Sequence, residues 1–68
     1  MDSFERLIHR AVSNGHRFVV SHDPSERNEE WGIKYYPEAD SEGHYYAYAS
    51  SKEDAARRLL DELRGVFG

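Results

Sequence analysis

Tyrosines are the residues whose type and spacing first suggest chemistry in this sequence. Two form the adjacent pair Tyr35 and Tyr36, and three more lie close together at Tyr45, Tyr46 and Tyr48. A tyrosine packs and hydrogen-bonds at once, which is why it is enriched at protein interfaces, and its ring can also stack on a nucleic-acid base. The tyrosines therefore indicate non-covalent binding, and the question is which of them face the solvent.

Side chains that could catalyse a reaction or hold a metal are present without the spacing that either would need. The four histidines come from different segments with no helical i, i+4 pair, whereas a metal site needs three or four converging ligands. His22 and Asp23 could form an oriented base, but the chain offers no cysteine and no recognisable serine elbow for it to activate. Glu29 and Glu30 would suit a glycosidase only beside a deep cleft, which a domain of 68 residues can hardly enclose. We expect no enzyme, no metal site and no cofactor.

Charge is unevenly distributed along the chain. The net charge is −4, and the segment 23–43 alone carries seven acidic and two basic residues, a net of −5. Loop carboxylates can mimic nucleic-acid phosphates or pair with lysine and arginine of a partner, and they can equally serve only to solubilise turns and discourage edge pairing. The acidic residues that we consider candidates for partner contacts are Glu26, Glu29, Glu30, Asp40 and Glu42.

Two amphipathic helices at the ends of the chain must help to position these residues. Apolar residues at i, i+3, i+4, i+7 and i+8 predict a helix over 2–14, which ends at Gly15. A second apolar stripe predicts a helix that begins at Ser50 or Ser51 and ends near Gly65. The stripes consist of Phe4, Leu7, Ile8, Ala11 and Val12 in the first helix and of Ala55, Ala56, Leu59, Leu60 and Leu63 in the second.

Strands are predicted between the helices, from alternating apolar residues over 17–22, 31–36 and 44–49. Proline and charged residues interrupt the pattern in two short connections. Connections this short imply an antiparallel meander, because parallel strands need a crossover of a dozen or more residues. The chain is therefore expected to be a single α+β domain over 1–68 with the order α-β-β-β-α, in which a three-stranded antiparallel sheet carries both helices on one face.

Side-chain size indicates which face of the sheet the helices cover. Ala47 and Ala49 precede the second helix, and small residues there permit the helix to fold back close to the sheet, so Tyr45 on the same face is expected to point at the helices. The second strand is expected to turn its larger hydrophobic set the same way, namely Trp31, Ile33 and Tyr35. The opposite, open face is then predicted to consist of Val19, Ser21, Lys34, Tyr36, Tyr46 and Tyr48.

The start of the second helix resembles the double-stranded-RNA-binding domain family, whose last helix opens with Ser-Lys-Lys-x-Ala-Lys. Ser51, Lys52 and Ala55 match that pattern, whereas Glu53 and Ala56 stand where the other two lysines belong. The resemblance extends to the element order of the whole chain, and it implies the same topology. Losing two of the three lysines removes most of the electrostatic attraction to phosphates that the family relies on.

Two classes of function remain open. The first is a small acidic protein-binding module, an adaptor or inhibitor. It would dock through the open tyrosine face, which includes Lys34, and through the acidic loops. A phage or plasmid inhibitor of a host nucleic-acid-handling complex would suit the size and charge. The second is a nucleic-acid-binding domain that uses the tyrosines for stacking, or Lys52, Arg57 and Arg58 as phosphate contacts. The acidic loops argue against the second class, while the bases on both helices leave a non-acidic side.

Length and hydropathy restrict the partners and the location. A chain of 68 residues is near the size at which a single core is marginal, so a face-to-face homodimer would supply further burial. The apolar runs are too short to span a membrane, and the first ten residues contain acids and no apolar segment of a secretory signal. We therefore expect a cytoplasmic protein with a protein partner, with a second copy of the chain or a nucleic acid as the other candidates.

Overall fold

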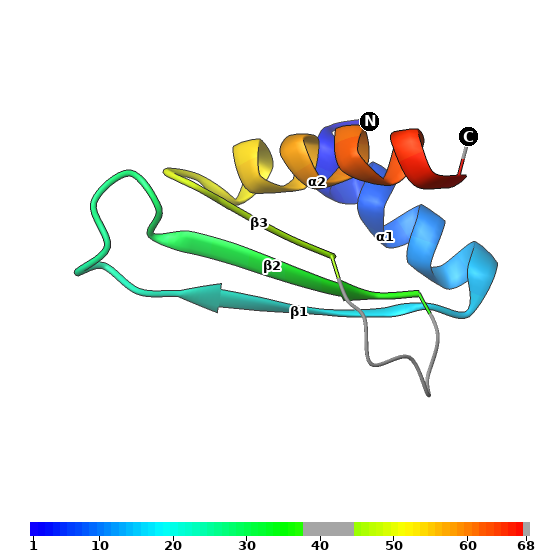
Figure 1. The fold of residues 1–68 in the computed structure, drawn as a ribbon, viewed down its shortest axis with the longest axis horizontal. Helices are drawn as coiled ribbons and strands as arrows, with labels where there is room; N and C mark the ends of the chain where they lie inside the picture. Colours follow the sequence, from blue (N-terminus) through cyan, green and yellow to red (C-terminus); the bar gives the residue numbers. More distant parts are fainter. Residues whose placement is uncertain (38–44, 68) are drawn as a thin grey trace.

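The structure is a computed structural model that describes residues 1–37 and 45–67, the last two of them without their side chains. Its elements are α1 (Ser3–Asn14), β1 (Arg17–His22), β2 (Trp31–Tyr36), β3 (Tyr45–Ala49) and α2 (Lys52–Phe67). The strands form one antiparallel sheet in the order β1-β2-β3. Both helices lie on the same side of this sheet (Figure 1), so the predicted α+β fold with the order α-β-β-β-α is confirmed.

Local chemistry explains both ends of α1 and the start of α2. Asp2 caps α1, because its Oδ1 accepts a hydrogen bond from the N–H of Glu5 at 2.8 Å. Gly15 ends this helix in the left-handed region at φ 69°, which glycine adopts without steric cost. Of the two serines predicted to cap α2, Ser51 has this role, since its Oγ accepts a hydrogen bond from the N–H of Asp54 at 3.1 Å.

The end of the second helix differs from the prediction, which placed it near Gly65. This prediction is wrong, because α2 continues to Phe67. A glycine ends a helix when it takes the left-handed conformation, and among the described residues the glycine that does so is Gly15. A glycine inside a helix costs only about 1 kcal/mol relative to alanine, so packing of the rest of the helix can outweigh it. Within the described part of the chain, neither helix is long and apolar enough to cross a membrane.

The covered face of the sheet carries the hydrophobic core. Ile33 and Tyr35 on β2 are fully buried. Ala47 and Ala49 on β3 are buried where α2 packs on the sheet, and their small side chains allow the helix to approach, as predicted. The core consists of Leu7, Ala11, Ile33, Tyr35, Ala47, Ala49, Ala55, Ala56, Leu59 and Leu63. The predicted start of the third strand at residue 44 lies outside the described residues.

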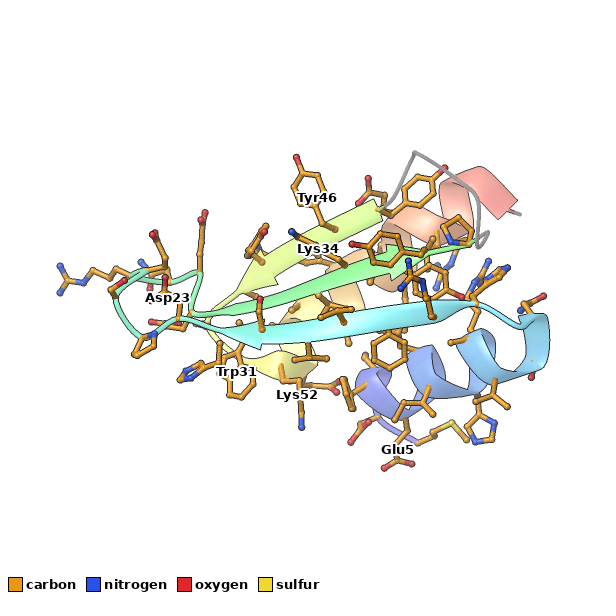
Figure 2. All side chains as sticks on the ribbon, turned by 90° about the horizontal axis from the view of Figure 1, so that it is seen from below. Glu5, Asp23, Trp31, Lys34, Tyr46 and Lys52 are labelled. Carbon is orange, nitrogen blue, oxygen red and sulfur yellow. The ribbon has the colours of Figure 1, made fainter. Side chains whose placement is uncertain are left out.

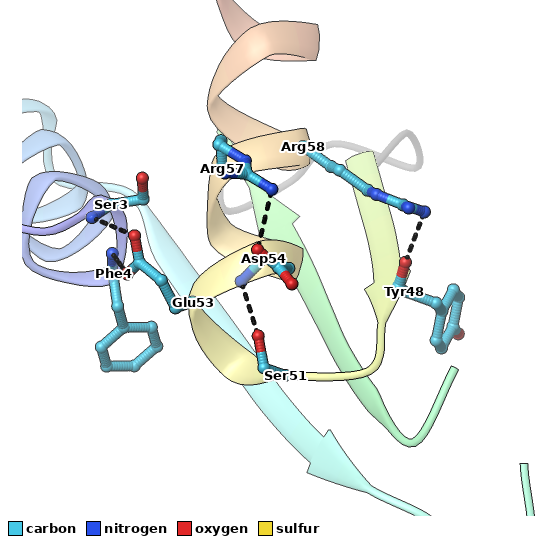
Figure 3. A network of polar contacts seen from close by, with 8 residues as sticks. All are labelled: Ser3, Phe4, Tyr48, Ser51, Glu53, Asp54, Arg57 and Arg58. Carbon is cyan, nitrogen blue, oxygen red and sulfur yellow. Dashed lines mark hydrogen bonds and ion pairs between the residues drawn. The ribbon is translucent and has the colours of Figure 1, made fainter. Parts of the chain in front are cut away.

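Glu53, a side chain of α2, ties the two helices together at their starts. Its carboxylate accepts hydrogen bonds from the backbone N–H groups of Ser3 and Phe4, at 2.9 and 3.1 Å (Figure 3). Both N–H groups belong to the first turn of α1, where they have no acceptor within the helix. These hydrogen bonds hold the pKa of Glu53 below its usual range, because they favour the charged form. Glu53 therefore acts as a second cap of α1, supplied from the other helix.

Candidate binding surface

Side chains on the open face of the sheet stand in rows that cross the three strands. The register places Val19 beside Lys34, and Lys34 beside Tyr46. Val19 and Tyr46 keep 51% and 57% of their surface exposed, and Figure 2 shows Lys34 and Tyr46 pointing away from the helices. The facing predicted from side-chain size is confirmed in this row, which presents an apolar, a basic and an aromatic side chain next to one another.

The ring of Tyr48 lies over Gly32 in the neighbouring row. A Cβ atom at position 32 would come within 2.5 and 2.8 Å of two ring carbons of Tyr48 and within 3.0 Å of the Ser21 hydroxyl oxygen. Gly32 is accordingly buried, while Tyr48 keeps 37% of its surface exposed. The rings of Tyr46 and Tyr48 meet edge to face, with 5.8 Å between their centroids. The absent side chain of Gly32 thus provides the space that the Tyr48 ring occupies.

An acidic hollow of about 460 Å³ opens beside this ring, at the end of the sheet where the loop between β1 and β2 begins and ends. Its lining combines the Tyr48 ring with carboxylates of that loop. The lining residues are Ser21, Asp23, Glu26, Glu29, Glu30, Gly32 and Tyr48. Glu29 and Tyr48 also line a neighbouring hollow of about 330 Å³ that includes Tyr46. The structure therefore brings the loop acids predicted from the sequence together with two of the predicted tyrosines.

Two acids of the loop, Asp23 and Glu30, differ in their hydrogen bonds. Asp23 Oδ1 accepts from the N–H and the hydroxyl of Ser25, at 3.1 and 2.7 Å, which lowers the pKa of Asp23. Glu30 Oε1 accepts from the N–H of Asn28 at 3.2 Å, whereas Glu30 Oε2 is buried with no hydrogen-bond partner in the described part of the chain. A buried carboxylate oxygen without a partner costs free energy. Glu30, which lines the hollow, thus has one carboxylate oxygen without a partner among the described residues.

The remaining residues predicted for protein contacts lie apart from this hollow or cannot be placed. Tyr36 is half-buried and pairs across the strands with Arg17, whose guanidinium carbon lies 4.6 Å from the ring centroid. It lies at the other end of β2 from Gly32 and the acidic loop. Asp40 and Glu42 lie outside the described residues. Tyr36 is therefore held at the far end of the open face by a cation of the protein itself.

The bases of α2 predicted as phosphate contacts are each engaged within the protein. Arg57 forms an ion pair with Asp54 at 2.8 Å, and Arg58 donates to the backbone carbonyl of Tyr48 at 3.1 Å (Figure 3). The Lys52 ammonium lies 4.5 Å from the centroid of the Phe4 ring. Arg58 thereby covers an acceptor on an edge strand of the sheet. Each of these bases therefore already has a contact within the protein.

His16 and His22 each contact an aromatic side chain in the fold. His16 Nδ1 lies 2.7 Å from the hydroxyl oxygen of Tyr35, and burial raises the pKa of that hydroxyl. The His22 ring packs on Trp31 with 4.3 Å between the centroids. Over residues 1–37 and 45–67, no group of three or more histidine, cysteine, aspartate or glutamate side chains could hold a metal ion.

Gly32 and Asp23 line the hollow, but Gly32 was not singled out from the sequence, and Asp23 was considered there only as an oriented base with His22. A signal for Gly32 was present, since a glycine within a strand often marks the close approach of another group. For Asp23, the sequence Asp-Pro-Ser directly after a strand is typical of a turn in which the aspartate accepts from the backbone two residues on. The identity of the ring over Gly32 depends on the register with β3, which the sequence did not specify.

No protein-family model matches the chain, and neither a curated protein nor a solved structure is significantly similar to it.

Proposed function

We propose that the protein is a small non-catalytic binding module, an adaptor or an inhibitor, that docks a basic segment of a partner protein on its open sheet face. The observation that carries this proposal is the position of Tyr48, whose ring belongs both to the exposed aromatic pair with Tyr46 and to the wall of the acidic hollow. A lysine or arginine of the partner would meet carboxylates and an aromatic ring in the same place.

Aromatic side chains on the open face support contact with a protein. Val19 and Tyr46 are more than half exposed, and large side chains of this kind rarely gather on one face of a protein without a use. Tyrosine contributes a large contact area with few rotatable bonds, so a partner orders it at a low cost in conformational entropy. Lys34 lies beside Tyr46 and offers one ammonium group to an acidic group at the rim of a complementary partner.

Carboxylates of the hollow support a basic partner. Glu26, Glu29 and Glu30 line it together with Asp23, whose pKa is lowered, so the hollow is negative at neutral pH and would repel a nucleic-acid backbone. A guanidinium or ammonium group entering the hollow would pair with the carboxylates that line it. The same entry would place the cation next to the Tyr48 ring.

Photo-cross-linking in the cell of origin tests this proposal. A benzophenone side chain at position 46 lies on the open face, and the same group at position 12 is the matched control, because Val12 is 76% exposed on α1. We expect a covalent product with one protein partner from position 46 and not from position 12. Charge reversal by Glu26→Lys and Glu29→Lys should remove this product, whereas Asp61→Lys on the exposed part of α2 should leave it unchanged.

The products also distinguish the other candidate occupants of this face. A product that contains two copies of the chain would mean that the face is a homodimer interface, and a product with RNA or DNA would favour the nucleic-acid-binding alternative. Equal yields from positions 46 and 12 would show that contact is unspecific. Each of these three results contradicts docking of a basic protein segment on the open face.

A further inference from the structure

A second charged hollow, of about 360 Å³, lies between the helices and carries the opposite charge to the first. Among the described residues its lining consists of Arg6 and Arg10 of α1 and Leu60 and Arg64 of α2. Three guanidinium groups therefore line one hollow in a protein whose net charge is −4. Neither the open sheet face nor its acidic loop contributes to this lining.

The paths of the two helices explain why these side chains meet. The helices are joined at their starts, where Glu53 accepts hydrogen bonds from Ser3 and Phe4. Figures 1 and 2 show that they diverge from there toward their C-terminal ends, and the space between them widens. Residues four apart on a helix share one face. The pair Arg6 and Arg10 on α1 and the pair Leu60 and Arg64 on α2 both line the hollow.

Positive charges of the three arginines lie close together in this arrangement. Two arginines at i, i+4 on a helix repel each other, and Arg64 adds a third positive charge from the other helix. The carboxylate of Asp61 lies 4.0 Å from Arg64, with both side chains well exposed, and a pair of that kind is worth little. Arg57, in comparison, holds its carboxylate at 2.8 Å on the same helix. The positive charge of the hollow is therefore only weakly compensated by this neighbouring acid.

We propose that this hollow is an anion site that binds a phosphate group, carried by inorganic phosphate or by a small phosphomonoester. The planar guanidinium fork donates two parallel hydrogen bonds to phosphate oxygens, and arginines from two helices can hold different oxygens of one group. A volume of about 360 Å³ lies within the range of small-molecule sites, and half-buried Leu60 offers an apolar contact to the group that carries the phosphate. This site goes beyond the proposed docking function, because it shares no residue with the open face.

Titration followed by nuclear magnetic resonance tests the site with defined probes. Inorganic phosphate and phenyl phosphate are added separately to the full chain at constant ionic strength, and the arginine Nε–H and leucine methyl signals are recorded. We expect saturable shifts of the Arg6, Arg10 and Arg64 signals with a Kd of about 1 mM or tighter. Tighter binding of phenyl phosphate, with shifts at Leu60, identifies a phosphomonoester as the natural ligand, and equal binding without shifts at Leu60 identifies the free ion.

Arginine variants decide whether the binding belongs to this hollow. Arg6→Gln and Arg64→Gln should each weaken phosphate binding about tenfold, because each removes a charge-assisted hydrogen-bond donor. Arg6→Lys keeps the charge without the fork and should lie between the unmodified protein and Arg6→Gln. Arg27→Gln, in the loop between β1 and β2, is the matched control and should bind phosphate as the unmodified protein does. A melting curve of each variant shows that it is folded.

Three results would overturn the proposal. One is a linear, unsaturated response to both probes, and another is an equal loss of binding in Arg27→Gln. The third is a short RNA duplex that shifts the same three arginine signals at a concentration far below that of phosphate, with an affinity that falls steeply with salt, since that would assign the helix side to nucleic acid.

Discussion

The two faces of the sheet differ in side-chain size as well as in exposure. On β3, buried Ala47 and Ala49 alternate with exposed Tyr46 and Tyr48, so adjacent residues of one strand serve opposite purposes. The covered face needs small residues there because α2 packs on it. The open face carries the large rings, and neither α1 nor α2 covers them there (Figure 2). The core therefore depends on the close approach of α2 to the sheet, whereas the fold does not require the large rings on the open face.

The largest expected effect in this comparison is on the covered face. Leu59→Ala removes a fully buried side chain between α2 and the sheet and should lower the free energy of unfolding by about 2–5 kcal/mol, through lost burial and the cavity left behind. Tyr46→Ala on the open face should change it by about 0.5 kcal/mol or less, as surface substitutions do. Urea denaturation of the two variants measures the difference.

A domain of this size has little stability to lose, so a milder variant completes the test on the covered face. Leu59→Met keeps the side-chain volume and should cost less than about 1.5 kcal/mol. Equal destabilisation by Leu59→Ala and Tyr46→Ala would contradict the assignment of the two faces.

A smaller effect is expected from enlarging a side chain on each face. Ala49→Leu places a large side chain where α2 approaches β3 and should cost about 1–3 kcal/mol by overpacking. Val19→Leu enlarges a half-exposed residue of the open face and should be nearly neutral. Thermal unfolding monitored by circular dichroism compares the two. If Ala49→Leu were neutral, the close approach of helix and sheet would not be what selects alanine in β3.

The smallest effect concerns the link between the helices and depends on pH. The pKa of Glu53 is lowered in the folded protein by the N–H groups of Ser3 and Phe4, so its contribution is fully present above the usual pKa of a glutamate. It is lost as the pH falls through the lowered pKa of the folded state. Glu53→Gln should therefore lower the melting temperature at neutral pH and reduce the loss of stability on acidification.

Glu62→Gln is the matched control for this pH dependence, because it removes the same charge from an exposed position further along α2. Asp23 also has a lowered pKa, so part of the acid-side loss should remain in the Glu53→Gln variant. Identical pH profiles of melting for Glu53→Gln and the unmodified protein would show that the link between the helices does not stabilise the fold.

Much of the open face could be predicted from the sequence, because strand geometry is local. Side chains of a strand alternate between two faces, so assigning Ala47 and Ala49 to the helices also assigned Tyr46 and Tyr48 to the solvent. The bounds of β1 and β2 follow from the same alternation and from the proline and charged residues beside them. The end of α2 could not be predicted in this way, since Gly65 is compatible with both a helical and a left-handed backbone.

The residues that line the acidic hollow could be predicted in part from the sequence. Glu26, Glu29 and Glu30 were candidates because acids are concentrated in that loop, and the structure places all three around one hollow. The role of Gly32 depended on which tyrosine pairs with it across β2 and β3, and that register is fixed only when the sheet forms.

By itself, the sequence determined the elements, their order and the face to which each strand residue points, because capping, period and side-chain size act over a few residues. Only the tertiary structure decided the partners of the long charged side chains. Glu53 caps a helix that begins 50 residues earlier, Arg58 covers the Tyr48 carbonyl, and Arg64 meets the arginines of α1 across a hollow. Such side chains have many rotamers and several possible partners of similar energy, and packing of the helices on the sheet sets the distances that select among them.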